Sequence, residues 1–140
     1  MPPFPDYIPR QTKLGPLEAE IMELIWRLGS PTVREIHDQI LSDPDRELAY
    51  ASVTTVLHRL AKKGWVVRRK EGRAFCWQPK LSKTDLQIVK AHDQLKQFLA
   101  ISNPDIVAAF ADTLDVASLE QLDAINQQIQ AARRQQEEQP

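Results

Sequence analysis

The chain has 140 residues, of which 42% are hydrophobic and 26% are charged, so it can bury one modest core and a second small element. Its formal net charge is −1, which gives no global argument for a polyanionic partner. It contains no apolar run close to the roughly 20 residues that span a bilayer and no apolar signal-peptide core, so we expect a cytoplasmic protein. Cys76 is the only cysteine, which excludes an internal disulfide and an all-cysteine metal cage.

The first 13 residues are rich in proline and predict a flexible, extended arm. Four of the ten prolines lie in the first nine residues: Pro2, Pro3, Pro5 and Pro9. A disordered tail is the simpler interpretation of this segment. The alternative is an arm that contacts a polyanion through Arg10 and Lys13.

Two short helices are predicted in the first third of the chain. The first begins after Gly15-Pro16, ends at Gly29 and has an apolar stripe at helical spacing: Leu17, Ile21, Leu24, Ile25 and Leu28. Thr32 and Glu35 form the capping box of the second helix, whose buried positions are Val33, Ile36 and Ile40. Residues 42–46, with two aspartates around a proline, predict a turn.

The segment 50–63 predicts a third helix with two different faces, and Gly64 is its expected C-cap. Apolar residues at spacings of three, one and three gather on one buried face: Val53, Val56, Leu57 and Leu60. The opposite face combines short hydroxyl side chains with long cations: Ser52, Thr55, Arg59 and Lys62. Such side chains can reach base edges and phosphates when a helix lies in the major groove of DNA.

A basic hairpin is predicted directly after this helix. The segments WVVRR and RAFCW alternate in polarity around Glu71-Gly72, which is a two-residue hairpin signal. From Arg59 to Arg73 there are seven cations and one anion, a local net charge of 7 − 1 = +6. Residues 1–80 carry 13 cations and 10 anions (+3), whereas residues 81–140 carry 5 and 9 (−4). This segregation indicates a protein that docks one basic face on a polyanion.

Three helices followed by a β-hairpin form the winged helix-turn-helix arrangement, with the third helix as recognition helix and the hairpin as wing. The expected fold class is therefore mainly α with a small β-hairpin. Residues 14–80 are predicted to be the winged-helix DNA-binding domain. The predicted DNA contacts lie on the recognition helix and the wing: Ser52, Thr54, Thr55, His58, Arg59, Lys62, Lys63, Arg68, Arg69, Lys70 and Arg73.

Three further helices are predicted beyond Pro79. Ser82 and Asp85 begin the first, Asn103-Pro104 begins a short one, and Ser118 opens the last, which has roughly heptad apolar spacing. These helices cannot bury their apolar faces alone, and a second copy of the chain is the simplest partner. The alternative is that they fold back onto the winged helix. Residues 81–135 are thus the predicted helical dimerisation domain, followed by a tail at 136–140, with contacts at Leu86, Leu95, Phe98, Phe110, Leu122, Ile125 and Ile129.

The sequence does not predict catalysis, a metal site or a cofactor. His37, His58 and His92 lie far apart without the spacing of a metal site. Cys76 lies inside a predicted strand, where it is expected to be a small, partly buried hydrophobe rather than a redox switch. No Ser/His/Asp set, carboxylate pair or glycine-rich phosphate loop is present, so the protein is not expected to be an enzyme.

Two runs of residues carry a family resemblance: E-x-x-I-M-x-x-I-W at Glu18–Trp26 and L-x-R-L-x-K-K-G at Leu57–Gly64. With the wing sequence KEGRAFCWQP, the chain resembles the penicillinase-repressor family (BlaI/MecI/CopY type) from Leu14 to about Ile129. The resemblance implies a homodimeric transcriptional repressor that reads a palindromic double-stranded DNA operator. Antibiotic-linked members commonly have S-P-K-T at the start of the recognition helix. The matching residues are Ala49, Tyr50, Ala51 and Ser52, so the resemblance also places Ala51 at the DNA.

The resemblance further implies a route of release. In that family a membrane-bound sensor metalloprotease is often encoded alongside, and a cut in the C-terminal part releases the operator. The matching pair here is Ala109-Phe110, although Phe110 can equally be only a core anchor. Copper-responsive members carry C-terminal C-x-C motifs, which this chain lacks. The alternative function is a winged-helix module for protein–protein interaction without sequence-specific DNA binding.

Overall fold

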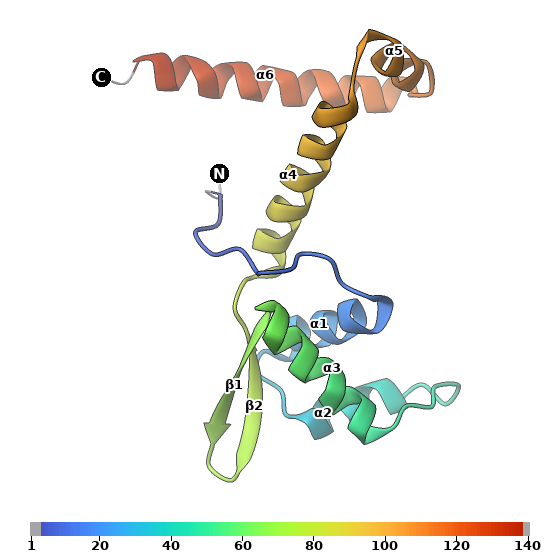
Figure 1. Ribbon diagram of the computed structural model, residues 1–140, viewed down its shortest axis with the longest axis vertical. Coiled ribbons are helices and arrows are strands. Elements are labelled where there is room, and N and C mark those ends of the chain that lie inside the picture. Colours follow the sequence, from blue (N-terminus) through green and yellow to red (C-terminus); the bar gives the residue numbers. More distant parts are fainter. Residues whose placement is uncertain (1–3, 139–140) are drawn as a thin grey trace. The chain divides into compact units, whose positions relative to one another are not determined.

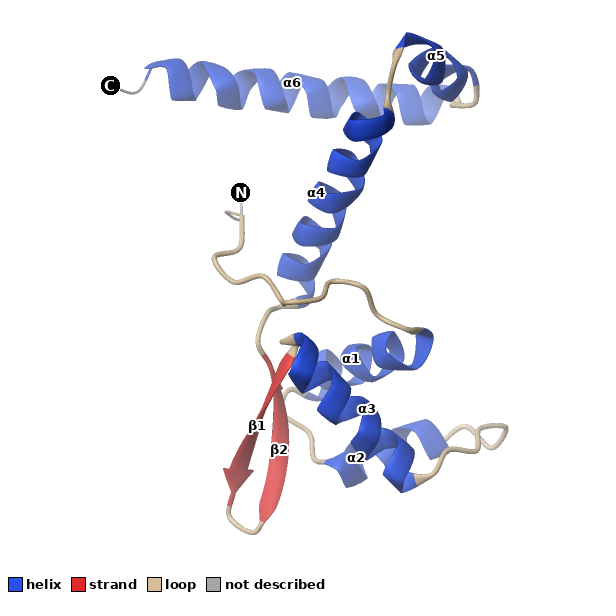
Figure 2. Ribbon diagram, in the orientation of Figure 1, coloured by secondary structure: helices blue, strands red, loops and turns tan. Residues whose placement is uncertain are grey.

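The computed structural model describes residues 4–138, and its element order confirms the predicted fold class (Figures 1 and 2). The described residues form three helices, an antiparallel hairpin and three more helices: α1 (Pro16–Leu28), α2 (Val33–Leu41), α3 (Tyr50–Lys63), β1 (Val66–Glu71), β2 (Ala74–Pro79), α4 (Lys83–Ile101), α5 (Pro104–Asp112) and α6 (Val116–Glu138). Pro2 and Pro3 of the predicted arm, and residues 139–140 of the predicted tail, lie outside the described residues. No described helix is long and apolar enough to cross a membrane.

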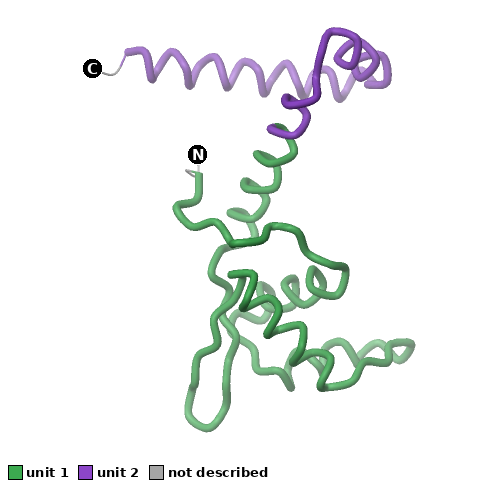
Figure 3. The backbone as a smooth tube through the Cα atoms, in the orientation of Figure 1, with its two compact units in different colours: residues 1–95 green, residues 96–140 purple. Residues whose placement is uncertain are grey.

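The chain divides into two compact units, Met1–Leu95 and Lys96–Pro140 (Figure 3). Unit 1 contains the N-terminal segment, α1 to α3, the hairpin and most of α4. Its single apolar core is built from the predicted helix stripes, and Ile21, Ile36 and Leu57 are fully buried in it. Trp65, the first residue after Gly64, is also fully buried and belongs to this core. Each such side chain contributes about 1.5–3 kcal/mol when fully buried.

The helix ends follow the capping signals in the sequence, with one exception. Thr32 Oγ1 accepts from the Glu35 N–H at 3.2 Å, and Glu35 Oε1 accepts from the Thr32 N–H at 3.1 Å. The prediction that Ser118 opens the last helix was wrong, because α6 begins at Val116. The carboxylate of Asp115 accepts the Ser118 N–H at 2.8 Å and so caps the helix two residues earlier.

The hairpin turn lies one residue later than predicted. Glu71 pairs with Ala74 across the two strands, so the loop consists of Gly72 and Arg73 rather than Glu71-Gly72. Gly72 has a φ of 63°, whereas no described non-glycine residue has a positive φ. A positive φ at only the first loop residue is the pattern of a type II′ turn, which fixes the glycine at that position.

The beginning of α4 belongs to the core of unit 1. Leu86 and Val89 are only 6% and 1% exposed, and the Trp26 indole N–H donates to the Leu81 carbonyl at 3.0 Å, which anchors the chain before the helix. The sequence predicts Leu86 as a dimerisation contact, but its side chain is already covered within its own unit. The apolar period alone could not show this, because a core face and a dimer face have the same spacing.

Unit 2 has little core of its own. The rings of Phe98 and Phe110 lie with centroids 5.1 Å apart, but α5 and α6 contain no buried residue. Large apolar side chains remain exposed on all three helical segments: Leu99, Ile101, Ile106, Val107, Phe110, Val116, Leu119, Leu122, Ile125 and Ile129. The N-cap expected from sequence is present, since Asn103 Oδ1 accepts the Ile106 N–H at 3.0 Å.

Candidate nucleic-acid interface

One face of α3 is exposed and polar along its length. Ala51, Thr55, His58 and Lys62 follow one another at spacings of four, three and four, so they share one side of the helix, opposite the core stripe. All four are exposed, and we call them the outer face of α3. Arg59 is exposed beside them. The outer face is therefore a free strip of hydroxyl, imidazole and cationic groups. The sequence predicts the polar face at Ser52, Thr55, Arg59 and Lys62, but Ser52 is half-buried, and Ala51 and His58 take its place beside Thr55 and Lys62.

The two threonines of α3 differ in what they present. Thr55 Oγ1 donates to the Ala51 carbonyl at 3.0 Å, which leaves its oxygen lone pairs and its methyl group free on the outer face. Thr54 Oγ1 donates to the Tyr50 carbonyl at 3.3 Å, and its side chain is half-buried at one flank. Ser52 is half-buried at the other flank, where it lines a shallow hollow of about 320 Å³ together with Thr55. Among the predicted hydroxyl contacts, Thr55 is thus the most accessible.

The wing carries four exposed cations around its tip: Arg68, Arg69, Lys70 and Arg73. The register pairs Arg68 with Trp77 and Lys70 with Phe75, and directly opposed residues share a face of the hairpin. The Arg68 guanidinium lies 4.3 Å from the centre of the Phe75 ring, a cation–π contact that orients it. Arg68 and Lys70 therefore lie on the hairpin face that also carries Trp77.

An aromatic contact connects this face of the wing to α3. The Trp77 ring is buried and meets the His58 imidazole edge to face, with centroids 5.4 Å apart. Because His58 belongs to the outer face of α3, the helix surface and the cationic side of the wing are continuous. The arrangement can present short polar groups to one part of a polyanion and cations to a neighbouring part.

Arg34 is a further cation that the sequence analysis did not name. A hollow of about 460 Å³ between α2, α3 and the wing is lined by Arg34 and Arg73, with Tyr50 and Phe75 as its aromatic walls. Arg34 has only a long contact to Asp38, at 4.0 Å, and is highly exposed. The sequence places Arg34 in the first turn of the second helix. In helix-turn-helix proteins the helix before the recognition helix crosses the phosphate backbone, so this position could have indicated a phosphate contact.

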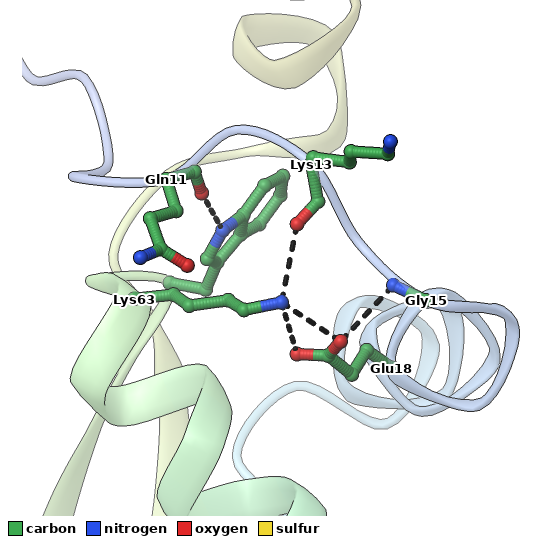
Figure 4. Close-up of polar contacts among 6 residues, drawn as sticks. Gln11, Lys13, Gly15, Glu18 and Lys63 are labelled. Atoms are coloured by element: carbon green, nitrogen blue, oxygen red, sulfur yellow. Dashed lines mark hydrogen bonds and ion pairs between the residues drawn. The ribbon is translucent and has the colours of Figure 1, made fainter.

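Unlike the exposed cations of α3 and the wing, Lys63 has its ammonium bonded to other residues of unit 1 (Figure 4). Its Nζ lies 2.8 Å from the Glu18 carboxylate and also donates to the Lys13 carbonyl at 3.2 Å. The Lys63 and Glu18 side chains are only 20% and 12% exposed. The sequence predicts Lys63 as a DNA contact, but the ion pair with Glu18 occupies its ammonium, so we leave Lys63 out of the candidate interface.

Glu18 is an ionised carboxylate held in place by its neighbours. Burial raises the pKa of Glu18, but the hydrogen bonds from Lys63 and from the Gly15 N–H and the charges of Lys63 and Arg59 lower it by more. The pKa of Glu18 therefore lies below its ordinary value. A carboxyl with a depressed pKa stabilises the fold above its unfolded-state pKa, and this contribution is lost as the pH falls through the folded-state pKa.

We expect Glu18→Gln to lower the free energy of unfolding at pH 7 by about 1–3 kcal/mol, because it leaves the half-buried Lys63 ammonium without its counter-charge. Below about pH 4.3, the ordinary pKa of glutamate, the difference in the free energy of unfolding between wild type and Glu18→Gln should become smaller. Urea unfolding at pH 7 and pH 3 measures both effects. Glu23→Gln is the control, since it removes an exposed pair with Lys83 and should change stability by under about 1 kcal/mol. Equal stability of wild type and Glu18→Gln at pH 7 would contradict the account.

The remaining chemistry-bearing side chains have structural neighbours. Cys76 is buried, and its thiol lies 3.6 Å from the Glu71 carboxylate. Burial first, and then the negative charge of Glu71, raise the pKa of the Cys76 thiol, which disfavours the reactive thiolate. The His37 Nε2 lies 2.7 Å from the Leu48 carbonyl, where it holds the connection between α2 and α3. In the described part of the chain, no group of three or more His, Cys, Asp or Glu could hold a metal ion.

Comparison with solved structures finds the solution structure of the DNA-binding domain of the repressor BlaI. It is 26% identical, covers 56% of this chain and 93% of that chain, and has a TM-score of 0.47. A second is the solution structure of the Bacillus licheniformis BlaI monomeric form in complex with the blaP half-operator. It is 29% identical, covers 52% of this chain and 87% of that chain, and has a TM-score of 0.45.

Sequence comparison finds relatives with related names. The transcriptional regulator BlaI of Mycobacterium tuberculosis (strain H37Rv) is 38% identical over 87 residues, which cover 61% of this chain and 62% of that protein. The penicillinase repressor of Bacillus licheniformis is 30% identical over 86 residues, which cover 61% of this chain and 66% of that protein. The chain thus spans just under two thirds of the length of these relatives. The model of the penicillinase repressor family matches residues 14–131, most of both units. The chain belongs to the penicillinase repressor family.

Proposed function

We propose that the protein is a transcriptional repressor that binds a palindromic DNA operator as a homodimer. The observation that carries the proposal is the continuous surface formed by the outer face of α3 and the cationic wing, joined by the contact between His58 and Trp77. Membership of a repressor family supports the regulatory role. The local charge of +6 between Arg59 and Arg73 supports a polyanion such as DNA as the partner.

In the proposed complex, α3 lies in the major groove and the wing follows the neighbouring phosphates. Thr55 offers an oxygen acceptor and a methyl group, which suit a base amino group or a thymine methyl. Ala51 and His58 lie on the same side, one turn before and one turn after Thr55. Ser52 and Thr54 at the flanks, and Arg59 and Lys62, complete the proposed helix contacts. Base contacts give specificity, whereas the cations fix the register of the protein on the duplex.

Four wing cations for each subunit predict a strong dependence of operator affinity on salt. If each subunit neutralises about four phosphates, the logarithmic salt slope of the dimer should be about −7. Arg73→Ala should flatten the slope by about 0.9 for each phosphate that the variant no longer neutralises. Titrations between 50 and 200 mM salt measure the slope, with Arg27→Ala, on the exposed side of α1, as the control. A slope that Arg73→Ala leaves unchanged places the wing away from the duplex.

Most of the proposed dimer contacts are apolar side chains of unit 2, and Leu95 at the end of unit 1 joins them. Leu122, Ile125 and Ile129 recur at spacings of three and four, so they form one stripe on α6. Leu95, Phe98 and Phe110 are the other proposed contacts. A patch of this kind on a chain with so little core around it is typical of an interface. A second copy with the same stripe covers it symmetrically, which matches the symmetry of a palindromic operator.

We further propose that proteolysis at Ala109-Phe110 by a membrane-bound sensor metalloprotease switches the repressor off. Both residues are exposed on α5, a helix of nine residues, and Phe110 is 44% exposed although its ring meets Phe98. A cut there separates α6, with its apolar stripe, from the chain that carries the winged helix. Mass spectrometry of the protein from derepressed cells tests this step. Fragments ending near Ala109 support it, and intact chain under full derepression contradicts it.

DNA binding itself is tested with fragments from upstream of the protein's own gene, at moderate salt and with scrambled competitor. We expect one fragment to bind at least about 1,000-fold more tightly than scrambled DNA. Binding no tighter than to scrambled sequence would contradict the proposal and favour a winged-helix module for protein–protein interaction.

A further inference from the structure

The N-terminal segment 4–13 has no helix or strand, yet it is bound to the junction between α3 and β1. The Tyr7 hydroxyl donates to the Gly64 carbonyl at 2.6 Å. The Gln11 N–H donates to the Lys63 carbonyl at 3.3 Å, and the Trp65 indole N–H donates to the Gln11 carbonyl at 2.7 Å (Figure 4). Three successive residues of the junction are thus each held by the segment.

We call this junction, residues 63–65, the hinge between α3 and the wing. Gly64 has a φ of 89°, in the left-handed region, and is the single residue between the end of α3 and Trp65. A Cβ on Gly64 would lie 2.7 Å from the Tyr7 hydroxyl oxygen, so the segment lies directly against the backbone there. The last carbonyls of a helix have no partner inside the helix, and the segment supplies donors to them. Without it, the buried Trp65 would also lose the acceptor of its indole N–H.

The same segment also reaches α4 and the end of the hairpin. Phe4 meets the His92 ring of α4 edge to face, with centroids 5.0 Å apart. The Lys80 ammonium lies 4.7 Å from the centre of the Tyr7 ring, just after β2. Pro9, which lies between Tyr7 and Gln11 in the chain, is buried. Residues 4–13 therefore cross from α4 to the hinge within unit 1, and all of them precede the family match at residues 14–131.

We infer that residues 4–13 are a strap that fixes the wing relative to α3, and that Tyr7 is a positioning residue for DNA binding. The inference rests on the proposed function, because operator binding needs α3 and the wing to engage the duplex together. A pre-set angle at Gly64 removes the cost of ordering the hinge on binding. Random DNA offers no specific base contacts to α3, so binding to it does not require α3 and the wing to engage the duplex at one fixed angle and depends less on this angle.

Two variants and two controls test the inference: a chain without residues 1–12, the full-length Tyr7→Phe variant, an internal control and a control substitution. Removal of residues 1–12 takes away the Gln11 carbonyl, and hydrogen exchange of the Trp65 indole N–H, followed by NMR, should become at least about ten-fold faster. The Trp26 indole N–H, bonded to Leu81, is the internal control and should not change. Tyr7→Phe removes only the hydrogen bond to the Gly64 carbonyl. It should weaken binding to operator DNA about five-fold and binding to random DNA less than about two-fold. Ile8→Ala, at the exposed neighbour, should leave both unchanged.

The salt slope of operator binding separates positioning from general destabilisation. A variant that is merely less stable has fewer active molecules but the same slope, whereas a loosened wing neutralises fewer phosphates and flattens it. Unchanged Trp65 indole exchange in the truncated chain overturns the strap. If indole exchange is faster in the truncated chain but Tyr7→Phe leaves operator affinity and the salt slope unchanged, the positioning role of Tyr7 is overturned. If the wild-type chain does not prefer operator DNA, the proposed function and the positioning role both fail, while the exchange measurement still decides whether the strap exists.

Discussion

A chain that ends at Leu95 is expected to fold, to be monomeric and to bind operator at least about 100-fold more weakly than the full chain. Unit 1 keeps its whole core in this fragment, including Leu86 and Val89 of α4. What it loses is the apolar stripe of α6, and with it the tether between two half-sites. Sedimentation and operator titration measure the two effects.

The position at which the fragment ends decides whether it keeps the core of unit 1. A fragment ending at Lys80 lacks three buried apolar side chains: Leu81, Leu86 and Val89. Since each contributes about 1.5–3 kcal/mol when fully buried, the free energy of unfolding of this fragment should be lower by the sum of the three contributions. It serves as a control for the difference between unfolding and loss of the dimer. A dimeric 1–95 fragment, or one with undiminished operator affinity, would show that the dimer does not need the apolar side chains of unit 2.

Thr55→Ala is expected to cost about 1–3 kcal/mol at each half-site, and twice that in a symmetric dimer, on operator DNA alone. The hydroxyl of Thr55 is already satisfied within the helix through Ala51, so its removal should leave the fold intact. Competition titrations against operator and random DNA show whether the loss is specific. Thr84→Ala, an exposed threonine on α4, is the matched control. An equal loss on both DNAs would show that Thr55 does not read bases.

The local features of this fold could be predicted from sequence because their signals lie within a few residues. The capping box of Thr32 and Glu35, the stop at Gly64 and the core stripe of α3 depend only on helical period and neighbouring donors. The start of α6 was misplaced because Asp115 and Ser118 are both capping residues, and the carboxylate three residues earlier took the role.

Features that depend on distant residues could not be predicted in this way. Lys63 looked like part of a cation run, and only the fold brings it to Glu18, 45 residues earlier in the chain. The contacts of Tyr7 and Gln11 with the hinge have the same origin, since proline-rich sequence gives no sign of what it lies against. Leu86 has the spacing of a dimer residue but faces its own core.

The central claim, that the outer face of α3 and the wing bind DNA, is tested most directly by NMR chemical-shift mapping. Full-length protein would be titrated with the fragment selected from upstream of its own gene. We expect the largest amide shifts on Ala51, Thr55, His58 and the wing residues 68–73, and small shifts in α5 and α6. Shifts concentrated in α5 and α6, or in α1, with α3 and the wing unchanged, would contradict it.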